Sequence, residues 1–155
     1  MMVIDAGVVL ALALPLPFSA KAAERVRSLR IAREELFAPA LLEYEICSAL
    51  RRAITRGVLS EEEARSALDL ITALRIQPIT PAASLHTRAL SWSARLGQSK
   101  AYDAQYLALA EEMGCGLLTS DLRLARSARA LGTTWVEDLG ATPPPPAPPA
   151  PRGRQ

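Results

Sequence analysis

The 155-residue chain has little of what disulfide frameworks, zinc sites and aromatic cores require: two cysteines, one histidine and 5% aromatic residues. This scarcity argues against a disulfide-stapled extracellular fold and against a cysteine–histidine zinc site. Cys47 and Cys115 each lie in an apolar, regular segment. We therefore expect buried, reduced thiols and an intracellular, cytoplasmic protein.

An excess of one charge and a long apolar run are also missing. Without Arg152 and Arg154, 16 of the 18 Lys and Arg residues face 16 Asp and Glu residues in the body of the chain. Nucleic acid would therefore be held by local patches or by a metal rather than by a wholly basic surface. The apolar run over 7–18 is too short to span a bilayer, and Asp5 stands where a signal peptide carries a basic residue. We expect neither membrane association nor secretion.

The chain does contain a regular alternation of short β-branched or apolar runs with helical patterns. Pro and Gly residues mark most of the boundaries between them. Strands are predicted at 2–5, 35–38, 76–79, 116–119 and 133–136. Helices are predicted at 7–14 (a short helix or turn), 20–32, 40–56, 60–73, 80–96, 99–114 and 122–131.

This alternation predicts parallel pairing with right-handed crossovers. The fold class is therefore α/β, a three-layer α/β/α domain with a central parallel sheet of four to five strands, over residues 1–139. From Gly140 the composition changes to mostly Pro. Residues 140–155 are predicted to form a disordered, extended, Pro-rich tail.

The helix predicted over 99–114 is apolar on nearly every side but carries Asp103 near its start. One interpretation is that Asp103 faces solvent and favours the positive helix N-terminus. The other is that Asp103 is a metal ligand, which predicts further carboxylates at strand ends and helix starts. Asp5 ends one predicted strand and Asp121 follows another. Glu43 and Glu45 both flank the apolar stripe of helix 40–56, so periodicity does not choose between these two.

In a parallel α/β sheet the site lies beyond the carboxyl ends of the strands. Carboxylates brought together there repel one another, and a divalent cation removes the repulsion. Ligands that are all oxygen favour Mg²⁺ or Mn²⁺. Such an ion activates water and neutralises charge on a phosphate, so hydrolysis of a phosphodiester is the natural chemistry.

Four segments resemble the four motifs of PIN-domain ribonucleases, and most of all the toxin component of VapBC-type toxin–antitoxin pairs: Val3–Gly7, Pro39–Leu50, Tyr102–Ala110 and Leu117–Asp121. The resemblance extends from residue 2 to about residue 137. It implies Glu45 rather than Glu43 as the second acid, and a supporting hydroxyl at Thr119. The acids that it implies as catalytic and as ligands of Mg²⁺ or Mn²⁺ are Asp5, Glu45, Asp103 and Asp121.

The resemblance further implies endonucleolytic cleavage of RNA to 5′-phosphate and 3′-hydroxyl ends. It implies a homodimer, inhibited by a cognate antitoxin whose C-terminal segment fills the groove around the acids. Arg51, Arg52 and Arg123 are candidate contacts to RNA phosphates. The alternative for each arginine is a solvated helix face that pairs with acids.

One departure from the family pattern is Gly7, which stands where Ser or Thr usually follows the first Asp by two residues. It motivates an alternative function, a catalytically weakened PIN-like module that binds RNA or protein. A phosphatase of the aspartyl-phosphate kind needs an acid at that place, so Gly7 argues against it. A receiver domain needs adjacent acids at the first strand end, and Ala6 argues against that.

Overall fold

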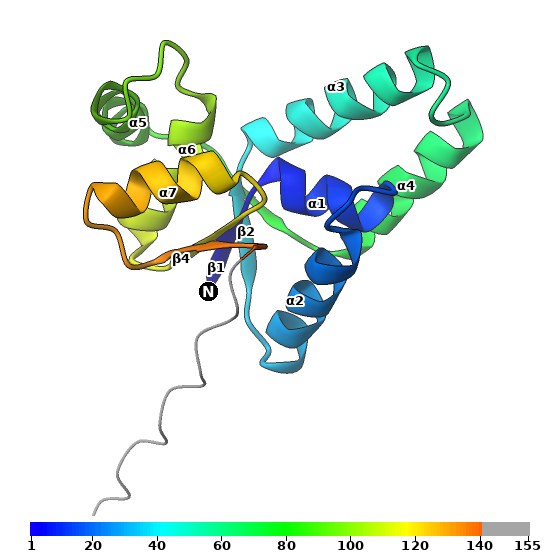
Figure 1. The fold of residues 1–155 in the computed structure, drawn as a ribbon, viewed down its shortest axis with the longest axis horizontal. Coiled ribbons are helices and arrows are strands. Elements are labelled where there is room, and N and C mark those ends of the chain that lie inside the picture. The colour runs from blue at the N-terminus through cyan, green and yellow to red at the C-terminus, as the bar shows by residue number, and fades with distance from the viewer. Residues whose placement is uncertain (141–155) are drawn as a thin grey trace, which may run out of the picture.

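A computed structural model describes residues 1–140, and Figure 1 shows their arrangement. The strands are β1 (Met2–Ile4), β2 (Leu36–Pro39), β3 (Gln77–Ile79), β4 (Gly116–Thr119) and β5 (Val136–Asp138). The helices are α1 (Ala6–Ala13), α2 (Ser19–Ile31), α3 (Leu41–Thr55), α4 (Glu61–Ala73), α5 (Ala83–Arg95), α6 (Tyr102–Met113) and α7 (Leu122–Ala130).

The five strands form one parallel sheet in the order β3-β2-β1-β4-β5. The central strand β1 places Val3 opposite Phe37 of β2 and Leu117 of β4. Helices α5, α6 and α7 lie on one side of the sheet, and α1 to α4 lie on the other (Figure 1). The predicted α/β class and parallel sheet are confirmed.

The core is built mainly from Ala, Leu and Val, as the low aromatic content requires. Helix α6 packs against β1, β2 and β4, and its Ala104, Leu107 and Ala108 are fully buried. Small side chains let this helix approach the sheet closely on more than one face. Trp92 is buried and meets Trp135 edge to face, with ring centroids 6.0 Å apart.

The last strand begins three residues later than predicted. The β-branched run at 133–136 suggested the strand, but Gly132, with a φ of 92°, turns the chain after α7, and residues 133–135 complete the turn. Strand β5 then pairs Leu117 with Val136 and Thr119 with Asp138. This strand ends in two charged residues, Glu137 and Asp138, so a prediction based on apolar runs does not extend to them.

The prediction of buried thiols is wrong for Cys47, which is exposed; Cys115 is half-buried, and neither forms a disulfide. The buried stripe of α3 is Leu42, Ile46 and Leu50, and Cys47 lies beside it on the solvent side.

Within residues 1–140, no helix combines the length and the apolar content needed to cross a membrane. The predicted tail at 140–155 lies, apart from Gly140, outside the residues that the structure describes.

Candidate active site

The four predicted acids come from four different elements near the carboxyl edge of the sheet. Asp5 follows β1 and caps α1, and Asp121 follows β4 and caps α7. Because β1 and β4 are neighbours in the sheet, these two acids end adjacent strands. Asp103 lies in the first turn of α6, and Glu45 lies one turn into α3.

Asp5 is the most buried of the four, with 8% of its surface exposed. Its Oδ1 accepts a hydrogen bond from Val8 N at 2.8 Å, and its Oδ2 accepts one from Ser120 N at 3.1 Å and another from the Thr119 hydroxyl. These donors favour the charged carboxylate, but burial outweighs them and raises the pKa of Asp5 to about 6. Asp5 is thus held in one orientation at a cost in desolvation.

Glu45 is half-buried and accepts a hydrogen bond from the Tyr106 hydroxyl at 2.5 Å. Burial raises the pKa of Glu45, the Tyr106 hydrogen bond lowers it, and the charge of Asp103 raises it. Burial, followed by the charge of Glu45, raises the pKa of the Tyr106 phenol, which therefore stays protonated and donates. The neighbouring Glu43, which the resemblance does not imply as a site acid, is exposed.

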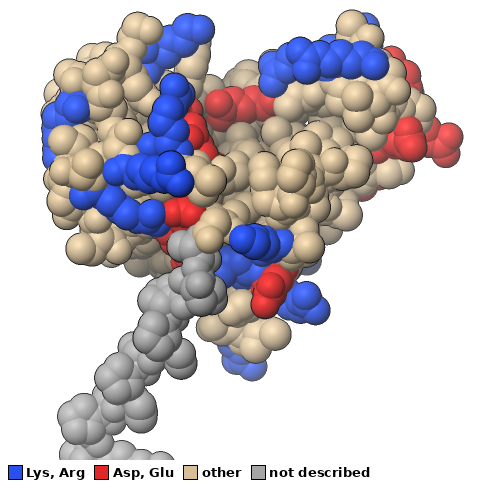
Figure 2. Space-filling model, viewed as in Figure 1, with Lys and Arg blue, Asp and Glu red and all other residues tan. Residues whose placement is uncertain are grey.

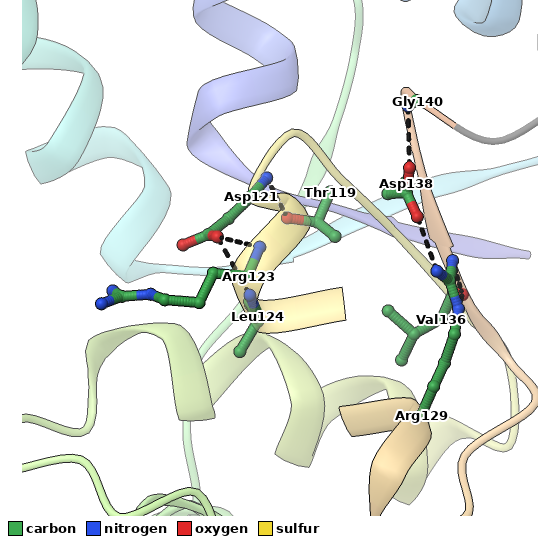
Figure 3. Close-up of polar contacts among 8 residues, drawn as sticks. All are labelled: Thr119, Asp121, Arg123, Leu124, Arg129, Val136, Asp138 and Gly140. Carbon is green, nitrogen blue, oxygen red and sulfur yellow. Dashed lines mark hydrogen bonds and ion pairs between the residues drawn. The ribbon is translucent and has the colours of Figure 1, made fainter. Parts of the chain in front are cut away.

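Asp103 and Asp121 complete the row of four acids, which runs in the order Asp5, Glu45, Asp103 and Asp121. Burial raises the pKa of Asp103, and so does the charge of Asp121, whereas the Gln98 amide, 3.3 Å away, and Arg123 lower it. The Oδ1 of Asp121 accepts from the backbone N–H groups of Arg123 at 2.8 Å and Leu124 at 3.0 Å, which makes it the N-cap of α7 (Figure 3).

Thr119, predicted as a supporting hydroxyl, lies between two of the acids. It is fully buried, its hydroxyl donates to Asp5, and its Oγ1 accepts from the backbone N–H of Asp121 at 2.9 Å. One side chain therefore ties the ends of β1 and β4 together.

Electrostatic repulsion links the acids in sequence: Asp5 with Glu45, Glu45 with Asp103, and Asp103 with Asp121. No Lys or Arg in the described part of the chain forms an ion pair with any of the four. The atoms that these four acids could offer to a metal are all carboxylate oxygens, and such ligands fit Mg²⁺ or Mn²⁺. As the side chains stand, residues 1–140 contain no three acidic, His or Cys groups close enough to share one ion.

Sequence reasoning missed a fifth acid near this edge. Asp138 ends β5 beside Thr119 and is buried. Arg129 forms an ion pair with its Oδ2 at 2.7 Å, and Gly140 N donates to its Oδ1 at 2.8 Å. Asp138 is thus charge-balanced by an arginine, whereas the four site acids form no ion pair with Lys or Arg in the described residues. Figure 3 shows that Asp121 and Arg123 extend to the side away from Arg129 and Asp138.

Sequence reasoning also missed the contact between Tyr106 and Glu45. Core packing, rather than stacking on a base, is what the sequence predicts for Tyr106; its 3% exposure confirms this, but its hydroxyl also reaches the site. The available signal was spacing, because residues three apart on a helix share a face and Tyr106 follows Asp103 by three. The sequence predicts core packing for Tyr102 too, and this prediction is wrong, because Tyr102 is 58% exposed.

The candidate RNA contacts differ in their surroundings. Arg123 is exposed and lines a cleft of about 390 Å³ together with Asp103, Lys100 and Ser127. Arg51 is exposed and pairs with Glu61 at 3.4 Å, and Arg52 is exposed in the last turn of α3. Figure 2 shows Lys and Arg side chains gathered over the α6–α7 side of the molecule, next to acidic ones.

Comparison with known proteins identifies the fold and its family. The model of the PIN domain family matches residues 2–130. The VapC ribonuclease Mb0985 of Mycobacterium bovis is 41% identical over 100 residues, which span 64% of this chain and 76% of that protein. The crystal structure of PAE2754 from Pyrobaculum aerophilum has a TM-score of 0.66 at 22% identity and covers 90% of this chain and 83% of its own.

A second solved structure, VapBC2 from Rickettsia felis bound to a DNA fragment from their promoter, has a TM-score of 0.65 at 12% identity and covers 88% of this chain and 97% of its own. Both solved structures are too distant in sequence to bear on more than the fold. The chain belongs to the PIN-domain family. Within that family it groups with the VapC ribonucleases.

Proposed function

We propose that this protein is a divalent-metal-dependent endoribonuclease, the toxin of a VapBC toxin–antitoxin pair. The observation that carries the proposal is the row of four carboxylates, which are linked by mutual repulsion and form no ion pair within residues 1–140. Perturbed acids grouped at the carboxyl edge of a parallel sheet are what a catalytic metal site requires. Membership of the VapC ribonucleases supports RNA as the substrate.

Asp5, Glu45, Asp103 and Asp121 would hold Mg²⁺ or Mn²⁺. When bound, the ion would activate a water molecule and offset negative charge on the scissile phosphate. Because no three of the described side chains are yet close enough to share an ion, we expect binding to draw the carboxylates inward. Neutralising the repulsion among the acids would also lower the raised pKa values of Asp5, Glu45 and Asp103.

The chain's own residues have separable tasks. Three hydrogen-bond donors fix Asp5, and Tyr106 orients Glu45. Arg123, beside Asp103 in the cleft, would hold a phosphate of the RNA strand next to the bond that is cut. Water adds to phosphorus as the bond from phosphorus to O3′ breaks, and protonation of the leaving oxygen yields a 3′-hydroxyl and a 5′-phosphate.

The decisive experiment incubates the purified protein with a structured RNA and Mn²⁺, beside an Asp103→Asn variant. We expect cleavage by the parent protein, loss of at least about 10²-fold in rate in the variant, and 5′-phosphate ends on the products. RNA bound but left intact by the parent would instead support the weakened binding module that Gly7 motivates. Calorimetry that detects no Mn²⁺ binding would overturn the metal-dependent mechanism.

We further propose a homodimer, and a cognate antitoxin whose C-terminal segment fills the groove around the acids. The relationship to VapC ribonucleases supports a partner of this class. Co-expression with the product of a small neighbouring gene, followed by light scattering of the purified complex, tests both points. A monomer that cleaves RNA equally well with and without that product would contradict them.

A further inference from the structure

Gly7 lies in the first turn of α1 and faces the side chain of Ser120. A Cβ atom placed on Gly7 would lie 2.0 Å from the Ser120 Oγ, 3.4 Å from the Ser120 Cβ and 3.5 Å from the Asp5 Oδ1. The first distance is far inside van der Waals contact. The hydroxyl of Ser120 thus occupies the space that any side chain at position 7 would need.

The glycine at this position has no conformational reason. Its backbone is helical, without the positive φ that favours glycine, and glycine stabilises a helix less than alanine does. What the missing Cβ provides is room. The room is filled by a polar group rather than by an apolar one, on the side of α1 that faces the acids.

Ser120 stands in the middle of the site. It follows Thr119 and precedes Asp121, and its backbone N–H already donates to Asp5 at 3.1 Å. Its hydroxyl forms no hydrogen bond with another group in residues 1–140, so both its donor and its acceptor capacities are available beside the Asp5 carboxylate. A hydroxyl that only filled space would be replaceable by a methyl group.

We infer that Ser120 is a positioning residue of the acidic site, and that Gly7 exists to house its hydroxyl next to Asp5. The two positions form one unit: the Ser120 hydroxyl lies where a Cβ at position 7 would be, so a side chain at position 7 would displace that hydroxyl. The inference rests on the proposed function, since the group being positioned is a ligand of the proposed metal. It also removes the motive for a weakened module, because the hydroxyl missing at position 7 is present at position 120.

The test is a double-mutant cycle read by Mn²⁺ affinity in calorimetry and by RNA cleavage. Ser120→Ala removes the hydroxyl, and we expect about ten-fold weaker Mn²⁺ binding. Gly7→Ala keeps the hydroxyl but displaces it, so the same loss is expected. The Gly7→Ala/Ser120→Ala double variant should lose no more than either single variant, because both changes act on the same hydroxyl.

Rescue supplies the sharper result. Gly7→Ser combined with Ser120→Ala places a hydroxyl on the opposite side of the same space, and we expect it to recover most of the Mn²⁺ affinity. Ser91→Ala, an exposed serine on α5, is the matched control and should behave like the parent. Thermal unfolding of each variant without metal separates a loss of folding from a loss of binding.

The outcomes are distinguishable. A parent protein that binds no Mn²⁺ and cuts no RNA would remove the proposed function itself. A parent that binds and cuts, with Ser120→Ala unchanged in both, would overturn only the role of Ser120. Losses that add in the double variant, or no recovery on moving the hydroxyl to position 7, would show that the two residues act separately.

Discussion

At the scale of single residues, what separates the site acids from the other buried acid is the group that faces each carboxylate. Asp138 is met by the guanidinium of Arg129, whereas Asp5 and Glu45 are met by hydroxyl and backbone donors and by other acids. Neutral donors orient a carboxylate but leave its charge available to a cation. The same residue type thus has a structural role in one place and a reactive role in the other.

Tyr106 is predicted to act on the metal through Glu45. Tyr106→Phe removes the hydroxyl that orients this carboxylate while keeping the buried ring, so we expect about ten-fold weaker Mn²⁺ binding and a lower kcat. Calorimetry and single-turnover cleavage measure these effects.

The matched control for that variant is Tyr102→Phe, which changes an exposed tyrosine on the same helix. It should alter neither quantity. Equal behaviour of the two variants would remove Tyr106 from the site and leave it as a core residue only.

Arg123 and Arg51 are predicted to differ although both are exposed arginines. Arg123→Ala removes a cation from the cleft beside Asp103 but keeps the backbone N–H that Asp121 accepts, so KM for RNA should rise several-fold. The plot of log(kcat/KM) against the logarithm of the salt concentration has a negative slope, and this slope should become less steep by about one. Arg51→Ala breaks only an exposed ion pair with Glu61 and should leave both values unchanged. A larger effect from Arg51 would move the RNA path onto α3.

At the scale of elements, the sequence predicted the order and type of the strands and helices because each has a clear period or boundary residue. The spacing of Ser60 and Glu63, for example, is that of a capping box and predicts the start of α4, and the structure contains this box. The limits of β5 were missed because charged residues form its end, and their ion-pair partners, Arg25 and Arg129, come from elsewhere in the chain. The four acids and Thr119 could be named from motifs, but the contact of Tyr106 with Glu45 joins residues 61 apart and depends on tertiary packing.

The attachment of α7 to β5 is predicted to depend on Arg129. Its guanidinium binds the buried Asp138 and also donates to the Val136 carbonyl, with Nη2 at 2.9 Å (Figure 3). Arg129→Ala would remove the ion pair that faces the buried Asp138 carboxylate. Because Arg129 is partly exposed and water can replace some of the interaction, we expect a loss of about 2 kcal/mol in the free energy of unfolding.

Urea unfolding measures that loss. Arg126→Ala, an exposed arginine on the same helix, is the control and should change stability by less than about 0.5 kcal/mol. If Arg129→Ala were equally mild, the ion pair would contribute little to holding β5 in the sheet.

At the scale of the whole molecule, the burial and mutual repulsion of the site acids lower the stability of the folded protein. The pKa of Asp5 is about 6 in the folded protein, whereas an unperturbed aspartate has a pKa of 3.8. Between these values the folded state holds a proton that the unfolded state has released, so stability falls as pH rises through this interval and stays low above it. At about 1.4 kcal/mol per pKa unit, the loss from Asp5 alone is roughly 3 kcal/mol. The raised pKa values of Glu45 and Asp103 act in the same direction.

The metal-free protein should therefore melt several degrees lower at pH 8 than at pH 5. Asp103→Asn removes one charge from the four site acids, so the variant should melt above the parent at pH 8 and lose that advantage as the pH falls and the carboxylates with raised pKa values, Asp5, Glu45 and Asp103, take up protons. Mn²⁺ at a hundred times its Kd should stabilise the parent at pH 8 by about 2.7 kcal/mol and the variant by much less. Calorimetric melting with EDTA or Mn²⁺ measures all of these. A metal-free parent more stable at pH 8 than at pH 5, or a variant less stable than the parent at pH 8, would mean that the carboxylates do not repel one another in the folded chain.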